Sequence, residues 1–393
     1  MNKKVKIIIL VVLAVLLLAE VGFLAATQMR TQEVMPTEAP TAAPTEAPTE
    51  APTEAPTEAP TEAPTEAPTE APTEAPTEPP TEAPTEPPLL YADPLTGEPL
   101  AEPRLTRIFA VTINNVGKAL PHVGVNQAGL FFEMFVNDYA TRGLALYSDI
   151  REVEVVGSVR SWRYNFTDLA IAYDTFAAHA GGSNEVLRDA RNNAVDYVNI
   201  DGISSISFRD QDRKSAGYAT EHTLMLRGPE IYDYAQKKDY KVTHEEEKSY
   251  GLNFTEDGTP ANGEEAKLID ITFNHKGNKK LTTMTYDESF GKYVFTQYGK
   301  GIDSVTDKNR ETFENVFVIL TTVTNSGVYH VADLDGSGEG YYACGGKIIK
   351  IQWHHEDPKG PITFTLEDGT PLVQGIGNSY IGICPLKSTV EWE

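Results

Sequence analysis

The sequence predicts an α/β domain followed by a β-rich antiparallel domain, both placed behind an N-terminal transmembrane helix and a disordered Pro/Thr/Glu tether. Three observations support this fold class: an early apolar run, a long proline repeat, and a change of pattern within the remaining chain. Strands alternate with helices up to about residue 240, whereas short strands and turns follow. The predicted division is 1–29 (membrane anchor or signal segment), 30–90 (linker), 91–240 (α/β domain), 241–266 (connecting insertion) and 267–393 (β-rich domain).

Residues 5–27 form a nearly uninterrupted apolar run, preceded by Lys3, Lys4 and Lys6. About 20 apolar residues are enough for a helix to cross a bilayer, and flanking lysines favour the cytoplasmic side. We therefore expect a single-pass protein of the cell membrane whose C-terminal domains are extracytoplasmic. Because Glu20 divides the run, a cleaved signal peptide that leaves a secreted protein is the alternative. No cysteine follows the run, which excludes lipid attachment there.

Residues 36–88 consist of PTEA and PTEP units that hold 16 of the 26 prolines. Proline at every fourth position prevents a helix and repeated negative charge extends the chain, so this tract is predicted to be a disordered linker. It carries 12 glutamates and no lysine or arginine, so the formal charge of −24 leaves about −12 for the rest. An acidic folded part argues against nucleic acid as a partner.

The first folded part contains segments rich in β-branched and aromatic residues, which predict strands at 108–115, 129–136 and 144–150. Helical periodicity covers 163–173, and Ser183 is placed as the N-cap of another helix. A further helix is expected over 221–238, with a possible break at Gly228-Pro229.

The second folded part, after the polar insertion, reads as hairpins separated by glycine turns. Its two cysteines, Cys344 and Cys384, lie in strand-like segments. A disulfide would persist outside the cytoplasm, while buried thiols fit the apolar neighbours equally well, so both readings stay open.

The most informative chemistry is a group of arginines on short connections: Arg160, Arg163, Arg209 and Arg213, with Arg142 upstream. Guanidinium groups donate in a planar fork that suits phosphate and carboxylate. Arg160 and Arg163 come just before a predicted helix, whose first amides favour anions. The alternative is that each arginine pairs with a carboxylate of the fold.

Two further residues join the candidate ligand-binding set. His179 precedes Gly181-Gly182-Ser183, where a strand is expected to end, and ligands of α/β sheets often bind at such ends. It is a candidate acid, base or anion donor, with a buried structural histidine as the alternative. Glu133 lies among aromatic residues in a strand, so its charge needs a partner, for which an arginine of the group is the expected candidate.

Several separate segments resemble the YerB-like lipoprotein family: PLTG at 94–97, GSVRSWR at 157–163, AHAGGS at 178–183, FRDQDRK at 208–214 and, near the end, EDGTPLVQGIGNSYIGICP. The resemblance covers residues 92–386 with the motifs in the same order. It implies an exported, membrane-tethered protein with an N-terminal α/β domain and a C-terminal β domain. It implies no activity, because the function of that family is unknown.

Three functions remain open at this point. The favoured one is a non-catalytic envelope module whose arginine-lined cleft binds an anionic cell-wall glycan, a lipid headgroup or a peptide carboxylate, without a cofactor. The second is an enzyme acting on phosphate-linked glycan precursors, similar in architecture to LytR-CpsA-Psr-type transferases, with Mg²⁺ as a possible cofactor. The third is a protein-interaction module for an envelope protein, in which the arginines are internal staples.

Overall fold

The computed structural model describes residues 91–138, 140–298 and 310–393. The predicted anchor and tether, at 1–90, lie outside the described residues. Within the described ranges no helix is long and apolar enough to cross a membrane.

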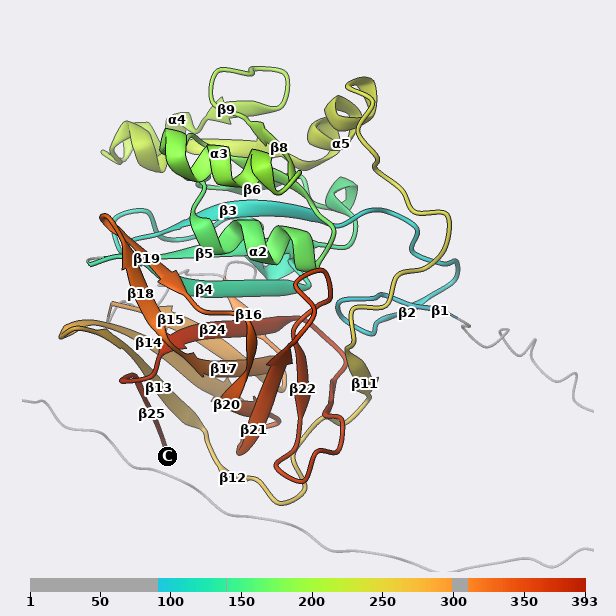
Figure 1. The fold of residues 1–393 in the computed structure, drawn as a ribbon, viewed down its shortest axis with the longest axis vertical. Helices are drawn as coiled ribbons and strands as arrows, with labels where there is room; N and C mark the ends of the chain where they lie inside the picture. The colour runs from blue at the N-terminus through green and yellow to red at the C-terminus, as the bar shows by residue number, and fades with distance from the viewer. Residues whose placement is uncertain (1–90, 139, 299–309) are drawn as a thin grey trace, which may run out of the picture. The chain divides into compact units, whose positions relative to one another are not determined.

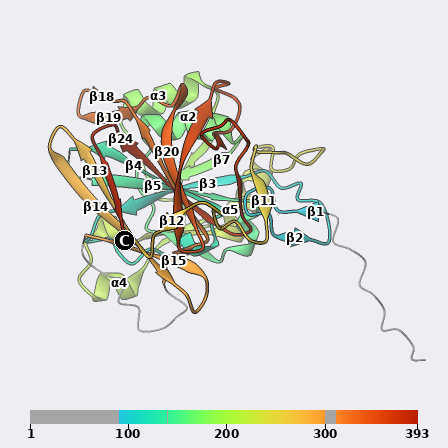
Figure 2. The same cartoon turned by 90° about the horizontal axis from the view of Figure 1, so that it is seen from below.

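A large mixed sheet runs through both predicted folded parts (Figure 1). Its strands lie in this order: β12 (Glu264–Glu265), β21 (Lys347–His355), β20 (Gly336–Cys344), β17 (Asn315–Thr321), β24 (Ser379–Pro385), β4 (Leu130–Asn137), β5 (Ala140–Tyr147), β3 (Phe109–Asn115), β7 (Phe176–His179) and β8 (Asp196–Asn199), with β22 (Thr363–Thr365) paired to β21. In Figure 2, β4, β5, β3 and β7 follow one another across this sheet.

The junction between the two parts is a pair of parallel strands. β24 pairs with β4 from Ser379 opposite Leu130 to Ile383 opposite Met134, and β24 also runs parallel to β17. Every residue of β24 is buried, as expected for a strand covered on both faces. The prediction that the second part is purely antiparallel is therefore wrong, because β24 pairs in parallel with β17 and with β4 of the first part.

The two faces of the main sheet carry different layers. One face packs against helices α2 (Tyr164–Ala172) and α3 (Asn184–Asn192), through residues such as Phe132, Leu144 and Phe166. The opposite face packs against α5 (Gly228–Lys237) and a second sheet. Because side chains alternate along a strand, neighbouring residues of β3, β4 and β5 belong to different layers. We call these the helix face and the second-sheet face.

The second sheet is antiparallel and has the strand order β16 (Thr312–Phe313), β15 (Lys292–Gln297), β14 (Asn278–Asp287), β13 (Leu268–His275) and β25 (Thr389–Trp392). Smaller elements complete the described chain. They are a three-stranded sheet of β6 (Val155–Gly157), β10 (Leu224–Arg227) and β9 (Ser207–Arg209); the pairs β1 (Tyr91–Ala92) with β2 (Pro99–Leu100), β11 (Asn253–Thr255) with β23 (Val373–Gly375), and β18 (Val323–Ser326) with β19 (Tyr329–Ala332); the helix α4 (Gln211–Ser215); and the 3₁₀ turns Val125–Gln127, Ile150–Glu152 and Thr220–His222.

The predicted helix ends can be compared with the structure. Ser183 caps α3 by accepting a hydrogen bond from the Val186 amide at 3.3 Å, which confirms its predicted role. The helix expected over 221–238 is wrong in its first half, where residues 224–227 form β10. Pro229 then lies in the first turn of α5, where its missing N–H is not needed.

The two cysteines are free and buried. Cys344 packs in the helix-face core and Cys384 in the second-sheet core, so the main sheet separates their side chains. The disulfide alternative is therefore wrong, and burial first of all raises the pKa of Cys344 to about 12.

Candidate functional site

The candidate site is built on a segment that crosses the carboxyl ends of β3 and β7. The Asn114 amide donates to the Ser158 carbonyl at 2.8 Å, and the Arg160 amide donates to the Thr112 carbonyl at 3.1 Å. On the other side, the Ala180 amide donates to the Arg160 carbonyl at 2.8 Å and the Trp162 amide donates to the Gly181 carbonyl at 3.0 Å. The backbone of residues 158–162 is thus fixed between the two strand ends, which is where α/β sheets commonly bind ligands.

Arg142, Arg160 and Arg163 form an arginine cluster on this segment and the adjoining strand. Arg142 extends from the helix face of β5, opposite Asn114, and its Nη1 donates to the Ser161 carbonyl at 3.0 Å. Arg163 is the N-cap residue of α2, and its Nη1 donates to the Trp162 carbonyl at 2.7 Å. In the described part of the chain, none of the three guanidinium groups forms an ion pair with a carboxylate.

The arginine cluster carries positive charge that no carboxylate in the described part of the chain neutralises through an ion pair. Burial, followed by the charges of Arg163 and Arg160, holds the pKa of Arg142 well below its ordinary value. Burial and the charge of Arg160 also lower the pKa of Arg163, against an opposing effect of Tyr329. Arg142 donates to the carbonyl of Ser161, which stands between Arg160 and Arg163 in the chain, so the three arginines belong to one local group. Like charges held together in a partly desolvated place favour the binding of an anion.

Unpartnered buried atoms concentrate at the same place. Among the described residues, the Nε atoms of all three arginines of the cluster lack a hydrogen-bond partner, as do Asn114 Oδ1 and Ser158 Oγ. A buried polar atom without a partner costs about 1–3 kcal/mol, so such atoms require an explanation. The arginine Nε–H groups are donors, and the oxygens of a phosphate or carboxylate would satisfy them.

His179 also lies on the helix face, at the end of β7, and is fully buried. Its Nδ1 lies 2.7 Å from the Gly181 carbonyl oxygen, which sets Nδ1 as the protonated nitrogen, while Nε2 has no partner among the described residues. Burial lowers the pKa of His179 to about 4, against the hydrogen bond to Gly181. The side chain is therefore neutral at pH 7 and packs beside Trp162, with ring centroids 5.8 Å apart.

Arg209 and Arg213 were predicted for the same site, but the fold engages both elsewhere. Arg209 Nη2 pairs with Asp201 at 2.7 Å on the surface. Arg213 is buried and donates to the carbonyls of Ala119, Pro121 and His222. Arg209 and Arg213 therefore do not join the other arginines, because their guanidinium groups already donate to Asp201 and to backbone carbonyls.

Glu133 was expected to pair with an arginine, and this expectation is wrong. It lies on the second-sheet face of β4, whereas the arginine cluster lies on the helix face, so the sheet separates them. Its partner is Lys280 of β14, and the buried carboxylate also accepts from Thr282 and Tyr380. Burial raises the pKa of Glu133, but Lys280 and the hydrogen bonds from Thr141 and Tyr380 outweigh it and hold the pKa below its ordinary value.

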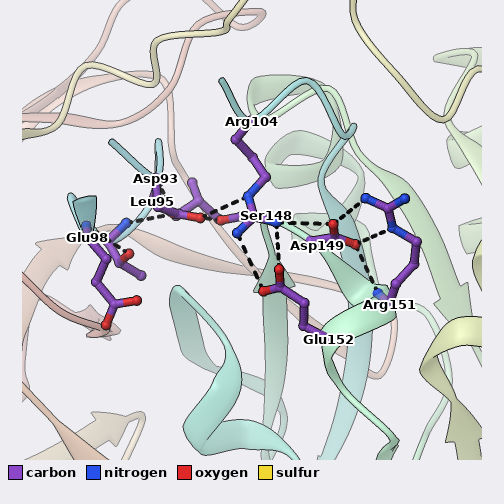
Figure 3. Close-up of polar contacts among 9 residues, drawn as sticks. Asp93, Leu95, Glu98, Arg104, Ser148, Asp149, Arg151 and Glu152 are labelled. Atoms are coloured by element: carbon purple, nitrogen blue, oxygen red, sulfur yellow. Dashed lines mark hydrogen bonds and ion pairs between the residues drawn. The ribbon is translucent and has the colours of Figure 1, made fainter. Parts of the chain in front are cut away.

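Other arginines of the same domain show what structural pairing looks like here (Figure 3). Arg104 Nη1 lies 2.8 Å from Glu152 and 3.1 Å from Asp149, and Arg151 Nε lies 2.8 Å from Asp149. The PLTG motif begins beside this group, where Asp93 accepts from the Leu95 amide at 2.9 Å and from Ser148 at 2.8 Å. In this network each arginine faces a carboxylate, which distinguishes it from the arginine cluster, although Arg104 Nε, 3.6 Å from Asp93, also lacks a hydrogen-bond partner among the described residues.

Three residues near the arginine cluster were not predicted from the sequence. Asn114 and Ser158 carry unpartnered buried atoms, and the Tyr329 ring lies 5.0 Å from the Arg163 guanidinium carbon. Tyr329 comes from β19 in the second part of the chain, so no local pattern near Arg163 points to it. Ser158 stands two residues before Arg160 in the motif GSVRSWR, which was the available signal.

The described residues enclose a cavity of about 960 Å³ between the 255–264 segment and the end of the second part. Tyr341, Lys350 and Trp392 line it, and no predicted site residue does. No group of three or more His, Cys, Asp or Glu side chains in the described ranges is placed to hold a metal ion.

The strand order and the motif-bearing segments define a class of two-domain, strand-rich proteins, and comparison with known families agrees. Residues 95–241 match the family described as "Protein of unknown function (DUF3048) N-terminal domain", and residues 269–381 match the corresponding C-terminal domain. The chain belongs to this family, which confirms the resemblance inferred from its motifs.

A relative from Bacillus subtilis (strain 168), named "Putative lipoprotein YerB", is 29% identical over 308 residues, which cover 74% of this chain and 86% of the relative. The crystal structure of the YerB protein from Bacillus subtilis has the same fold, with a TM-score of 0.65 at 24% identity. The match covers 76% of this chain and 99% of that one.

Proposed function

We propose that this protein is a non-catalytic module of the cell envelope that binds an anionic component through Arg142, Arg160 and Arg163. The observation that supports the proposal is the arginine cluster itself: three partly or fully buried guanidinium groups without a carboxylate partner in the described ranges. The ligand class is a phosphate or carboxylate group, because both present oxygens to the fork of an arginine.

The proposed location is extracytoplasmic and membrane-associated. The relative in Bacillus subtilis is named a lipoprotein, and this chain has an apolar run at residues 5–27 and a proline-rich tract after it. A single membrane-spanning helix and secretion after signal cleavage are both predictions of the sequence. The second and third candidate functions are an envelope enzyme that uses Mg²⁺ and a protein-interaction module.

The test is a thermal-unfolding titration of the full chain, in an uncharged detergent, with pyrophosphate, inorganic phosphate and acetate. A ligand at a hundred times its Kd stabilises the native state by about 2.7 kcal/mol, which raises the unfolding temperature by several degrees. We expect a rise with at least one of these anions in the wild-type protein, and its loss in Arg160→Ala and Arg163→Ala.

Arg188→Ala is the matched control, because Arg188 is an exposed arginine of α3 and its removal leaves the cluster intact. Its titration should follow that of the wild type. An equal rise in Arg160→Ala and in the wild type would assign the anion to another place. No rise with any of the three anions would refute the proposal.

A further inference from the structure

A second polar cluster lies buried on the second-sheet face. Glu133 Oε1 contacts Lys280 Nζ and also accepts from Asn115 Nδ2 at 2.8 Å. The amine of a lysine and the carboxamide of an asparagine are therefore held against the same carboxylate oxygen. Asn115 and Glu133 are fully buried, and Lys280 is 4% exposed.

The surroundings of the Lys280 amine are aromatic and closed to solvent. Its nitrogen lies 5.5 Å from the ring centre of Phe273, 5.8 Å from that of Phe295 and 5.4 Å from that of Tyr298. Burial lowers the pKa of Lys280, although the charge of Glu133 opposes this. A lysine in such a place exchanges its proton with the carboxylate more readily than a lysine in water, and the uncharged amine is a nucleophile.

The carboxamide of Asn115 is polarised for attack. Gln297 Nε2 donates to Asn115 Oδ1 at 2.6 Å, which places a donor on the oxygen where negative charge would develop. The leaving nitrogen, Nδ2, already contacts Glu133. One carboxyl group thus lies against both the attacking nitrogen and the leaving nitrogen, as a proton shuttle requires.

We propose that Lys280 and Asn115 form an intramolecular isopeptide bond with Glu133 as the proton-transfer residue. Lys280 first passes a proton to Glu133 and attacks Asn115 Cγ, which forms the Nζ–Cγ bond. Glu133 then protonates Nδ2 and takes a second proton from Nζ as the Cγ–Nδ2 bond breaks. A lysine ammonium, the Glu133 carboxylate and a carboxamide thus give a secondary amide, a protonated Glu133 and ammonia, so atoms and charge balance without an oxidant or cofactor.

The bond would join the two halves of the family fold. Asn115 ends β3 in the N-terminal domain, and Lys280 lies in β14 of the C-terminal domain. It would replace the buried ion pair of Lys280 and Glu133, whose desolvation is costly, by a neutral amide and a protonated carboxyl group.

The test is peptide mass analysis of the folded full-length chain after denaturation and trypsin digestion. An acylated Lys280 resists trypsin, so the expected product is fragment 108–118 linked to fragment 280–292. It should be lighter than the sum of the two peptides by about 17 Da, one ammonia. Lys280→Arg and Glu133→Gln should give the separate, unmodified peptides.

Lys279→Arg is the matched control, because Lys279 is the exposed neighbour of Lys280 on β14 and should leave the linked product unchanged. The peptide masses of the wild-type protein test the proposal even if a variant fails to fold. Full recovery of unlinked 108–118 and 281–292 from the wild type would overturn the proposal. Conversion of Asn115 to aspartate without a linked product would overturn it as well.

Discussion

Removal of single arginines should separate structural from ligand-binding roles, and Arg213→Met is the most informative change. Arg213 donates to the Ala119 carbonyl at 2.8 Å, to the His222 carbonyl at 3.3 Å and to the Pro121 carbonyl, and it lies 3.6 Å from Asp210. Methionine keeps much of the apolar stem but leaves these carbonyls without their donor. Each buried acceptor that loses its partner costs about 1–3 kcal/mol, so we expect a total loss of about 4 kcal/mol.

Two other arginine substitutions provide the comparison for this loss of stability. Arg209→Ala breaks a surface pair in which the arginine side chain is 33% exposed, so the expected loss is at most about 1 kcal/mol. Arg160→Ala removes a charge that has no carboxylate partner among the described residues and that repels Arg142, so stability should change by about 0.5 kcal/mol or less, or increase.

The assay is urea unfolding of the full chain at pH 7, in a buffer free of phosphate and carboxylate, followed by tryptophan fluorescence. The free energies come from the midpoint and slope of each curve. A loss of unfolding free energy in Arg160→Ala as large as that in Arg213→Met would show that Arg160 stabilises the fold. That result would refute the distinction between the two kinds of arginine.

Two further predictions concern buried groups. The folded-state pKa of His179 is about 4, below its unfolded value, so its stabilising effect is complete above about pH 6.5 and is lost as the pH falls toward 4. Between pH 7 and pH 5 this costs about 2 kcal/mol. Urea unfolding at both pH values should show a smaller difference in His179→Asn, which keeps a donor for Gly181, and an unchanged difference would contradict the assignment. Cys344 and Cys384 should resist alkylation in the folded protein and both react in denaturant without a reductant. Protection that persists in denaturant until a reductant is added would instead indicate a disulfide.

Local sequence was enough to predict the elements of the first part. The strand at 108–115, the helix at 163–173 and the Ser183 cap depend on periodicity and on side chains close in sequence, and the structure contains all three. The parallel contact of β24 with β4 joins residues about 250 positions apart. Neither residue composition nor hydrophobic periodicity indicates a pairing over such a distance.

The structure brings together only some of the residues that were predicted to share one site. Arg160 and Arg163 share a motif with the segment that positions them, so their grouping could be predicted. Whether an arginine is free depends on its distant neighbours. Arg213 is engaged by carbonyls of residues 119–121, and Arg209 by Asp201, and neither pairing has a sequence signature.

The end of β3 connects the two buried polar clusters. Asn114 faces the helix layer and the arginine cluster, while the next residue, Asn115, faces the second sheet and Glu133. The alternation of side chains along a strand is what separates them. Two polar residues at a strand end usually suggest a turn, yet here each is buried on its own face. The position of Asn114 beside Arg142 is therefore set by the same backbone that carries Asn115. A covalent bond at Asn115 would fix the strand end on which one side of the proposed anion site is built.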